Sequence, residues 1–94
     1  LKPTAIFCFC DQMAIGAMKE LRRRGRRIPE DVAIMGVDNL EVTEMLDPPL
    51  TTIEVHNNDL GIESAEILLR RIAHNDAIPE QVKLQPKLIE RAST

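Results

Sequence analysis

The sequence predicts an α/β fold in which a parallel sheet lies between helices, as a three-layer α/β/α arrangement. Residues 5–9 and 32–37 are continuously apolar rather than alternating, which is typical of parallel strands covered on both faces. An amphipathic helical pattern separates the two runs. Residues 5–37 therefore form a predicted strand, helix, strand unit with a right-handed crossover.

The helix between these strands is predicted to begin at Asp11. Its apolar residues recur at the spacing of one helical face, and Gly25 followed by Pro29 gives the stop signal. The residues of that face are Ala14, Ala17, Met18 and Leu21. Five arginines between residues 22 and 27 could form a nucleic-acid patch, but cations at a helix C-terminus are favoured by the helix dipole, and we interpret them as a solvated helix end.

The second half of the chain continues the α/β pattern. Residues 41–46 predict a short helix, and the β-branched residues 51–55 predict a third strand after Pro48 and Pro49. Apolar residues hold helical spacing over residues 57–74, behind several candidate N-caps. Residues 81–84 and 87–91 are predicted as short strands, and residues 92–94 as a loose tail.

Length and charge restrict the kind of protein that this chain can form. Ninety-four residues allow one small domain or a piece of a larger one. The chain enters a strand-like run almost at once, so we expect a fragment of a larger fold. Twelve basic and fifteen acidic side chains give a net charge of -3, so the overall charge does not favour binding to nucleic acid. No apolar stretch is long enough to predict a membrane span.

Signals for metal, cofactor or catalytic chemistry are weak. Cys8 and Cys10 are two apart in a predicted strand, and His56 and His74 are distant from them, so two buried thiols are favoured over a metal site or a disulfide. No phosphate-binding glycine loop, nucleophile elbow or zinc-protease motif is present. We therefore expect no metal, no cofactor and no enzymatic activity.

Polar side chains follow each of the three predicted parallel strands. They are Cys10 and Asp11, then Asp38 and Asn39, then His56, Asn57 and Asn58. The C-terminal ends of parallel strands are where ligands bind in open α/β sheets, so this group predicts a site for a small polar ligand. Helix capping is the alternative role for Asp11, Asn39 and Asn58, which all precede predicted helices, and for Asp11 and Asn58 capping is favoured over ligand contact. Asp38 is less easily explained by capping. A phosphoacceptor role for Asp38 in a receiver-type domain is a weaker alternative.

Several motifs in order resemble the C-terminal part of the lactose-repressor (LacI/GalR) family of bacterial transcription regulators. The motifs are PTAIFC at residues 3–8, DQMAIGA at 11–17, IPEDV at 28–32, GVDN at 36–39, PLTTI at 49–53 and LIERAST at 88–94. The resemblance implies part of a periplasmic-binding-protein-like type I fold with an effector in a cleft between two subdomains. By similarity, residues 1–55 belong to the C-terminal subdomain, residues 56–85 to the N-terminal subdomain, and residues 86–94 return; the helix-turn-helix headpiece is absent.

The resemblance also implies roles for individual residues. Asp38 matches the family's effector-binding aspartate. Cys10 stands where an asparagine usually reaches the ligand, and Asn57 stands where many members place an aromatic or other cleft-lining residue, so the effector is expected to differ from a typical sugar. The family's dimer interface maps to two helical faces, which here offer Ile15, Met18, Met45 and Leu46.

The sequence therefore predicts the effector-binding and dimerisation portion of a transcription regulator. Its expected partners are a sugar-like small molecule, a second copy of the chain, and operator DNA reached through a headpiece outside these residues. The alternative is a periplasmic sugar-binding protein of a transporter, which shares the fold. Two free cysteines favour the cytoplasm, and with it the regulator.

Overall fold

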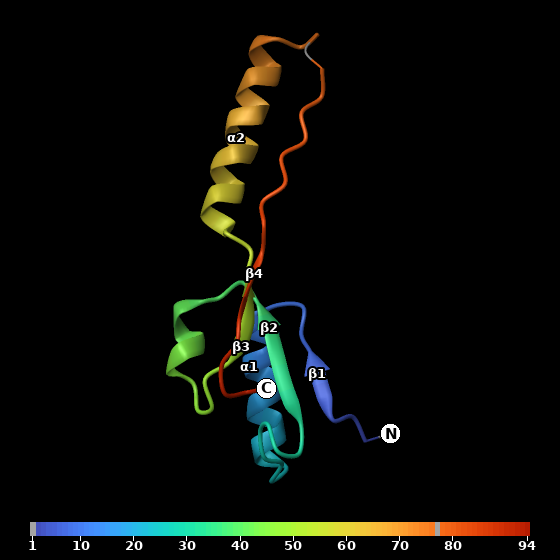
Figure 1. The fold of residues 1–94 in the computed structure, drawn as a ribbon, viewed down its shortest axis with the longest axis vertical. Helices are drawn as coiled ribbons and strands as arrows, with labels where there is room; N and C mark the ends of the chain where they lie inside the picture. Colours follow the sequence, from blue (N-terminus) through green and yellow to red (C-terminus); the bar gives the residue numbers. More distant parts are fainter. Residues whose placement is uncertain (1, 77) are drawn as a thin grey trace.

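The computed structural model describes residues 2–76 and 78–94, which form a small sheet with one long helix projecting from it (Figure 1). The molecule is elongated, with principal extents of 58 × 29 × 19 Å. In chain order the elements are β1 (Ala5–Phe7), α1 (Asp11–Arg23), β2 (Ala33–Val37), the 3₁₀ helix η1 (Glu41–Met45), β3 (Thr51–Glu54), α2 (Asn57–Ala73) and β4 (Lys87–Ile89).

The four strands form one sheet in the order β1, β2, β3, β4. The first three strands are parallel, and β4 pairs antiparallel with β3. Helix α1 connects β1 to β2 and packs against β2, as the apolar face of residues 14–21 predicts. The predicted α/β class is confirmed, with a mostly parallel sheet.

The core lies between α1 and one face of the sheet. Its buried apolar side chains are Cys8, Ala14, Met18, Ile28, Ile34 and Leu50. Cys8 is a buried free thiol, and burial raises its pKa, with the neighbouring thiol of Cys10 acting in the same direction. A thiol in this state behaves as a small hydrophobic side chain, as the sequence predicts for Cys8.

The opposite face of the sheet is largely uncovered. Phe7 of β1 is 66% exposed and Leu88 of β4 is 57% exposed. The prediction that β1 is covered on both faces is therefore wrong for the described residues, which supply only one of the two helical layers. The apolar face formed by these strands is suited to bury a second layer.

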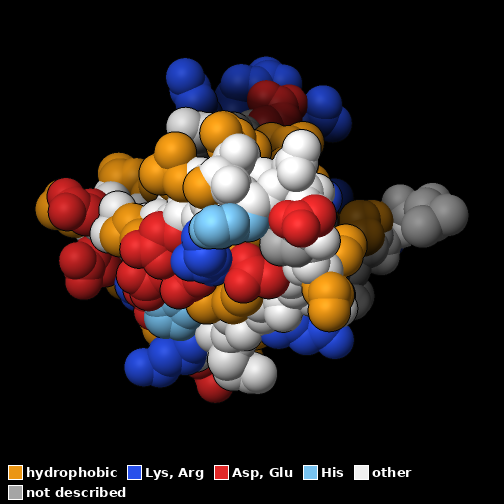
Figure 2. Space-filling model, turned by 90° about the horizontal axis from the view of Figure 1, so that it is seen from above, with side chains coloured by type: hydrophobic (Ala, Val, Ile, Leu, Met, Phe, Trp, Pro, Cys, Tyr) orange, Lys and Arg blue, Asp and Glu red, His pale blue; other side chains and the backbone are white. Residues whose placement is uncertain are grey.

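Helix α2 and the segment that returns from it extend away from the sheet (Figure 1). No residue of α2 is buried, and Leu69 and Ile72 are 65% and 70% exposed. Seen from this end, the surface mixes hydrophobic, acidic and basic side chains (Figure 2). The predicted strand at residues 81–84 is not observed, because a strand needs a hydrogen-bonded neighbour and no described strand lies beside this segment.

The C-terminal residues are held by the sheet, so the prediction of a loose tail is wrong. Ser93 is fully buried; its hydroxyl donates to the carbonyl of Ile34 at 2.6 Å and accepts from the amide of Thr51 at 2.8 Å. The Ser93 backbone accepts from the amide of Ile34 and donates to the carbonyl of Pro49. Ser93 thus supplies hydrogen-bond partners to backbone groups of β2 and of the residues at the start of β3, where no neighbouring strand among the described residues supplies them.

Candidate functional site

Asp38 lies at the C-terminal end of β2 with an unusual backbone conformation. Its φ is 111° and that of Asn39 is 50°, both on the positive side that side chains other than glycine rarely adopt. The amide of Asp38 donates to the carbonyl of Ile53 at 2.8 Å, so the pairing with β3 extends to this residue. The sheet therefore presents the half-buried Asp38 at the C-terminal end of its parallel strands, the edge at which ligands bind in open α/β sheets.

Asn57, the first residue of α2, contacts Asp38. The chain leaves β3 through His56, which has a φ of 53°, and enters α2 at Asn57. The Asn57 amide nitrogen Nδ2 donates to Asp38 Oδ1 at 3.2 Å. Two of the predicted site residues are thus in contact, and the bond joins the end of β2 to the first residue of α2.

Cys10 precedes α1 and does not lie in a strand. β1 ends at Phe7, and Cys10 is the N-cap residue of α1, with extended backbone and no hydrogen bond from its side chain to the helix. Its side chain is half-buried. Cys10 thus lies at the start of α1, beside Asp11, whose carboxylate accepts a hydrogen bond from the amide of Leu40 in the loop after Asp38.

Asp11 occupies a buried position, which differs from both roles expected of it. Its carboxylate accepts from Thr52 Oγ1 at 2.6 Å and from the amide of Leu40 at 2.8 Å, and the residue has no exposed surface. A carboxylate whose oxygens are both engaged inside the protein is closed to a ligand, and it does not cap α1. Asp11 joins the start of α1 to β3 and to the loop after Asp38.

Gly36 and Thr52 complete this buried junction, and neither was singled out from the sequence. A Cβ atom built on Gly36 would lie 2.3 Å from Asp11 Oδ1, so only glycine lets β2 pass this close to the carboxylate. Thr52 Oγ1 donates to Asp11 and also accepts from the amide of Asn39 at 3.2 Å. The available signal was the threonine pair that opens β3 (Thr51–Glu54).

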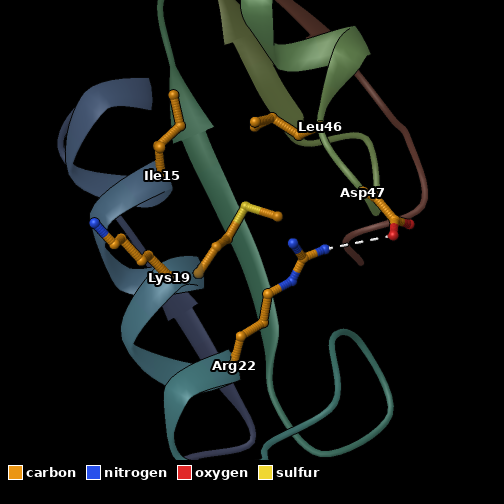
Figure 3. A pocket seen from close by; sticks show the side chains of 6 residues that line it. Ile15, Lys19, Arg22, Leu46 and Asp47 are labelled. Carbon is orange, nitrogen blue, oxygen red and sulfur yellow. Dashed lines mark ion pairs between the residues drawn. The ribbon is translucent and has the colours of Figure 1, made fainter.

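Three of the four predicted dimer-contact residues, Ile15, Met18 and Leu46, line a groove between α1 and the segment after η1 (Figure 3). The groove has a volume of about 210 Å³ and is lined by Ile15, Met18, Lys19, Arg22, Leu46 and Asp47. Ile15 and Leu46 lie at one end, and the Arg22 guanidinium is 3.7 Å from the Asp47 carboxylate at the other (Figure 3). Met18 is only 4% exposed and contributes mainly to the core, whereas Met45 is 76% exposed and lies outside the groove.

Residues 2–76 and 78–94 contain neither a metal-binding group of side chains nor a membrane-spanning helix. In this part of the chain no three histidine, cysteine or acidic side chains are grouped to hold a metal ion. None of the helices described there combines the length and apolar character needed to cross a membrane.

The whole chain, residues 1–94, matches the family model described as periplasmic binding protein-like domain, and the chain belongs to that family. It is 42% identical over 92 residues to the HTH-type transcriptional repressor PurR of Vibrio atlanticus. The matched region covers 98% of this chain and 28% of that protein. The chain thus spans little more than a quarter of this relative's length. The resemblance to lactose-repressor-type regulators that the sequence predicts is confirmed.

Solved structures of regulators show the same fold. A LacI family transcriptional regulator from Enterococcus faecalis with bound ribose superposes with a TM-score of 0.91 at 40% identity, covering 100% of this chain and 35% of that one. A regulator from Bacillus cereus gives a TM-score of 0.94 at 29% identity over 98% of this chain and 33% of that one. The transcriptional regulator CelR in complex with cellobiose gives 0.90 at 35% identity, over 99% of this chain and 28% of that one. These relatives are regulators, not enzymes.

Proposed function

We propose that this chain is the effector-binding and dimerisation portion of a DNA-binding transcription regulator, and that Asp38 is the residue that binds the effector. The observation that supports this most strongly is the geometry of Asp38. Its carboxylate stands at the ligand-binding edge of the sheet, on backbone with a φ of 111°, and is bonded to Asn57 at the entrance to α2. Unfavourable backbone geometry held by its surroundings clusters at ligand sites.

The effector in this proposal is a small polar molecule that donates hydrogen bonds. A carboxylate accepts from hydroxyl or N–H groups, and a bond to a charged acceptor is about twice as strong as one between neutral groups. Relatives with bound ribose and cellobiose support a sugar or a related metabolite. Cys10 would contribute only a weak hydrogen bond, so Asp38 and Asn57 provide most of the polar recognition from this chain.

The division of the chain follows from the same proposal. Residues 1–55 and 86–94 belong to one subdomain and residues 56–85 to the other, with the effector cleft between them. Support comes from the separation of α2 from the sheet and from its unburied apolar residues, which require a partner surface. Effector binding would favour one arrangement of the two subdomains and so change the affinity for DNA.

A second copy of the chain and operator DNA complete the proposed assembly. The groove between Ile15 and Leu46 is the proposed dimer surface, and DNA binds through a headpiece outside these residues in a cytoplasmic protein. A periplasmic sugar-binding protein is the alternative for this fold, but the relative from Vibrio atlanticus is a repressor, which favours the regulator.

A thermal-shift screen of the full-length protein tests the effector proposal. The panel contains D-ribose, cellobiose, nucleosides and small carboxylic acids, each titrated from micromolar to millimolar concentration. We expect at least one polar member to raise the unfolding midpoint in a saturable manner, because a ligand that binds only the folded state stabilises it. A panel in which no compound does so would contradict the proposal.

A further inference from the structure

We propose that Arg91 is a positioning residue for the effector site, holding Asn39 and thereby the backbone that presents Asp38. The inference rests on the proposed function of Asp38 and extends it to a residue near the other end of the chain. Arg91 follows β4, the strand that returns from the α2 segment.

The Arg91 side chain binds three separate pieces of the fold. Its Nη1 atom donates to Thr43 Oγ1 and to the carbonyl of Leu50, both at 2.8 Å, and its Nη2 atom donates to Asn39 Oδ1 at 2.9 Å. Its backbone amide donates to Thr51 Oγ1 at 2.9 Å. A planar guanidinium presents its donors in a rigid fork, so bonds in several directions restrict all the attached groups.

Asn39 needs such restraint because its backbone is in the left-handed region. Two consecutive residues with positive φ, Asp38 and Asn39, cost energy that surrounding contacts must offset. Thr52 Oγ1 accepts from the Asn39 amide on one side, and Arg91 donates to the Asn39 side chain on the other. Asn39 is thereby held at both its backbone and its side chain, and this sets the direction in which Asp38 leaves β2.

The position of Arg91 gives this contact a role in regulation. β4 follows the segment that leads back from α2, and Arg91 lies two residues beyond its end. Asp38 is also bonded to Asn57 at the start of α2. Asn57 at the start of α2 and Arg91 beyond β4 therefore bond to Asp38 and to Asn39, respectively. A displacement of either residue with the α2 segment changes the backbone that presents the effector site.

Two substitutions of Asn39 in the full-length protein separate positioning from general stability. Asn39→Gly removes the acceptor for Arg91 and tolerates the positive φ, whereas Asn39→Asp keeps an acceptor and is the matched control. Amide hydrogen exchange at residues 38–40 measures how firmly the loop is held, and calorimetric titration with D-ribose measures binding. We expect Asn39→Gly to accelerate exchange at residues 38–40 and to weaken ribose binding, each by about tenfold, whereas exchange at these amides in Asn39→Asp should stay close to that of the parent.

A double-mutant cycle with Arg91→Met shows whether the effect passes through the guanidinium. Once Arg91 is replaced, Asn39→Gly is expected to cause little further change in exchange at residues 38–40. The proposal is overturned if amide exchange at residues 38–40 is the same in the two Asn39 variants. It is also overturned if Arg91→Met lowers the unfolding midpoint while exchange at these amides is unchanged. If D-ribose does not bind the parent protein, this counts against ribose as the effector, while the exchange measurements still decide the role of Arg91.

Discussion

Replacing Gly36 by alanine tests the buried junction on which the candidate site is built. The added Cβ would lie 2.3 Å from Asp11 Oδ1 and 3.1 Å from Asp11 Cα, so the carboxylate must move. Overpacking a core costs about 1–3 kcal/mol, and the bond from Thr52 to this carboxylate, which the movement breaks, is worth about 1.5–3 kcal/mol. We therefore expect Gly36→Ala to lower the free energy of unfolding by about 3 kcal/mol.

Urea unfolding followed by circular dichroism measures this loss, with Gly16→Ala as the matched control. Gly16 is exposed in α1, and a Cβ built on it would meet no described atom within 4 Å apart from its chain neighbours and the backbone of its own helix. The same substitution there should therefore stabilise the protein by about 0.5–1 kcal/mol through helix propensity. Opposite signs for the two variants are the expected result. A Gly36→Ala protein as stable as the parent would refute the close approach of β2 to Asp11.

Three further substitutions test other parts of the structure. Thr52→Val leaves the buried Asp11 carboxylate without its hydroxyl donor, so the free energy of unfolding, measured with urea, should fall by about 2–4 kcal/mol. Thr52→Ser keeps the hydroxyl and should cost only about 1 kcal/mol. Equal losses in the two variants would contradict the hydrogen bond. Hydrogen bonds from the side chain and the amide of Arg27 hold the pKa of Asp31 at about 2, below its ordinary value of 3.8. The pair therefore stabilises the folded state above pH 3.8, and this stabilisation is lost as the pH falls toward the lowered pKa of about 2. The difference in stability between the parent and Asp31→Asn should therefore be present at neutral pH and vanish toward pH 2, and a difference independent of pH would argue against the pair. Leu46→Lys should shift the full-length protein toward monomer in sedimentation velocity, and an unchanged profile would remove this surface from the dimer proposal.

The parallel strands and both helices were predictable because local patterns determine them. Apolar runs identify β1 and β2, and the spacing of apolar residues identifies α1. The predicted strand at residues 81–84 failed because strand formation depends on a neighbour that a local pattern does not supply.

The position of the candidate site residues at the strand ends was predictable, and their individual contacts were less so. The rule that ligands bind at the C-terminal ends of parallel strands led to Asp38, and Asn57 lies within hydrogen-bond distance of it. The same rule placed Asp11 in the ligand site, although its carboxylate is buried under Leu40 and Thr52. Arg91 left no local signal, because its partners are far away in the sequence and meet it only after folding.

Titrating the effector against Asp38→Asn tests the central claim most directly. Asparagine keeps the size of the side chain and tolerates positive φ, but it lacks the charged acceptor. With the compound that most stabilises the full-length protein in the thermal-shift panel, calorimetry should show affinity lower by about tenfold or more for Asp38→Asn. The control Asp76→Asn, at an exposed position beyond the far end of α2, should bind as the parent does. Equal affinity for the parent and Asp38→Asn would contradict the claim that Asp38 binds the effector.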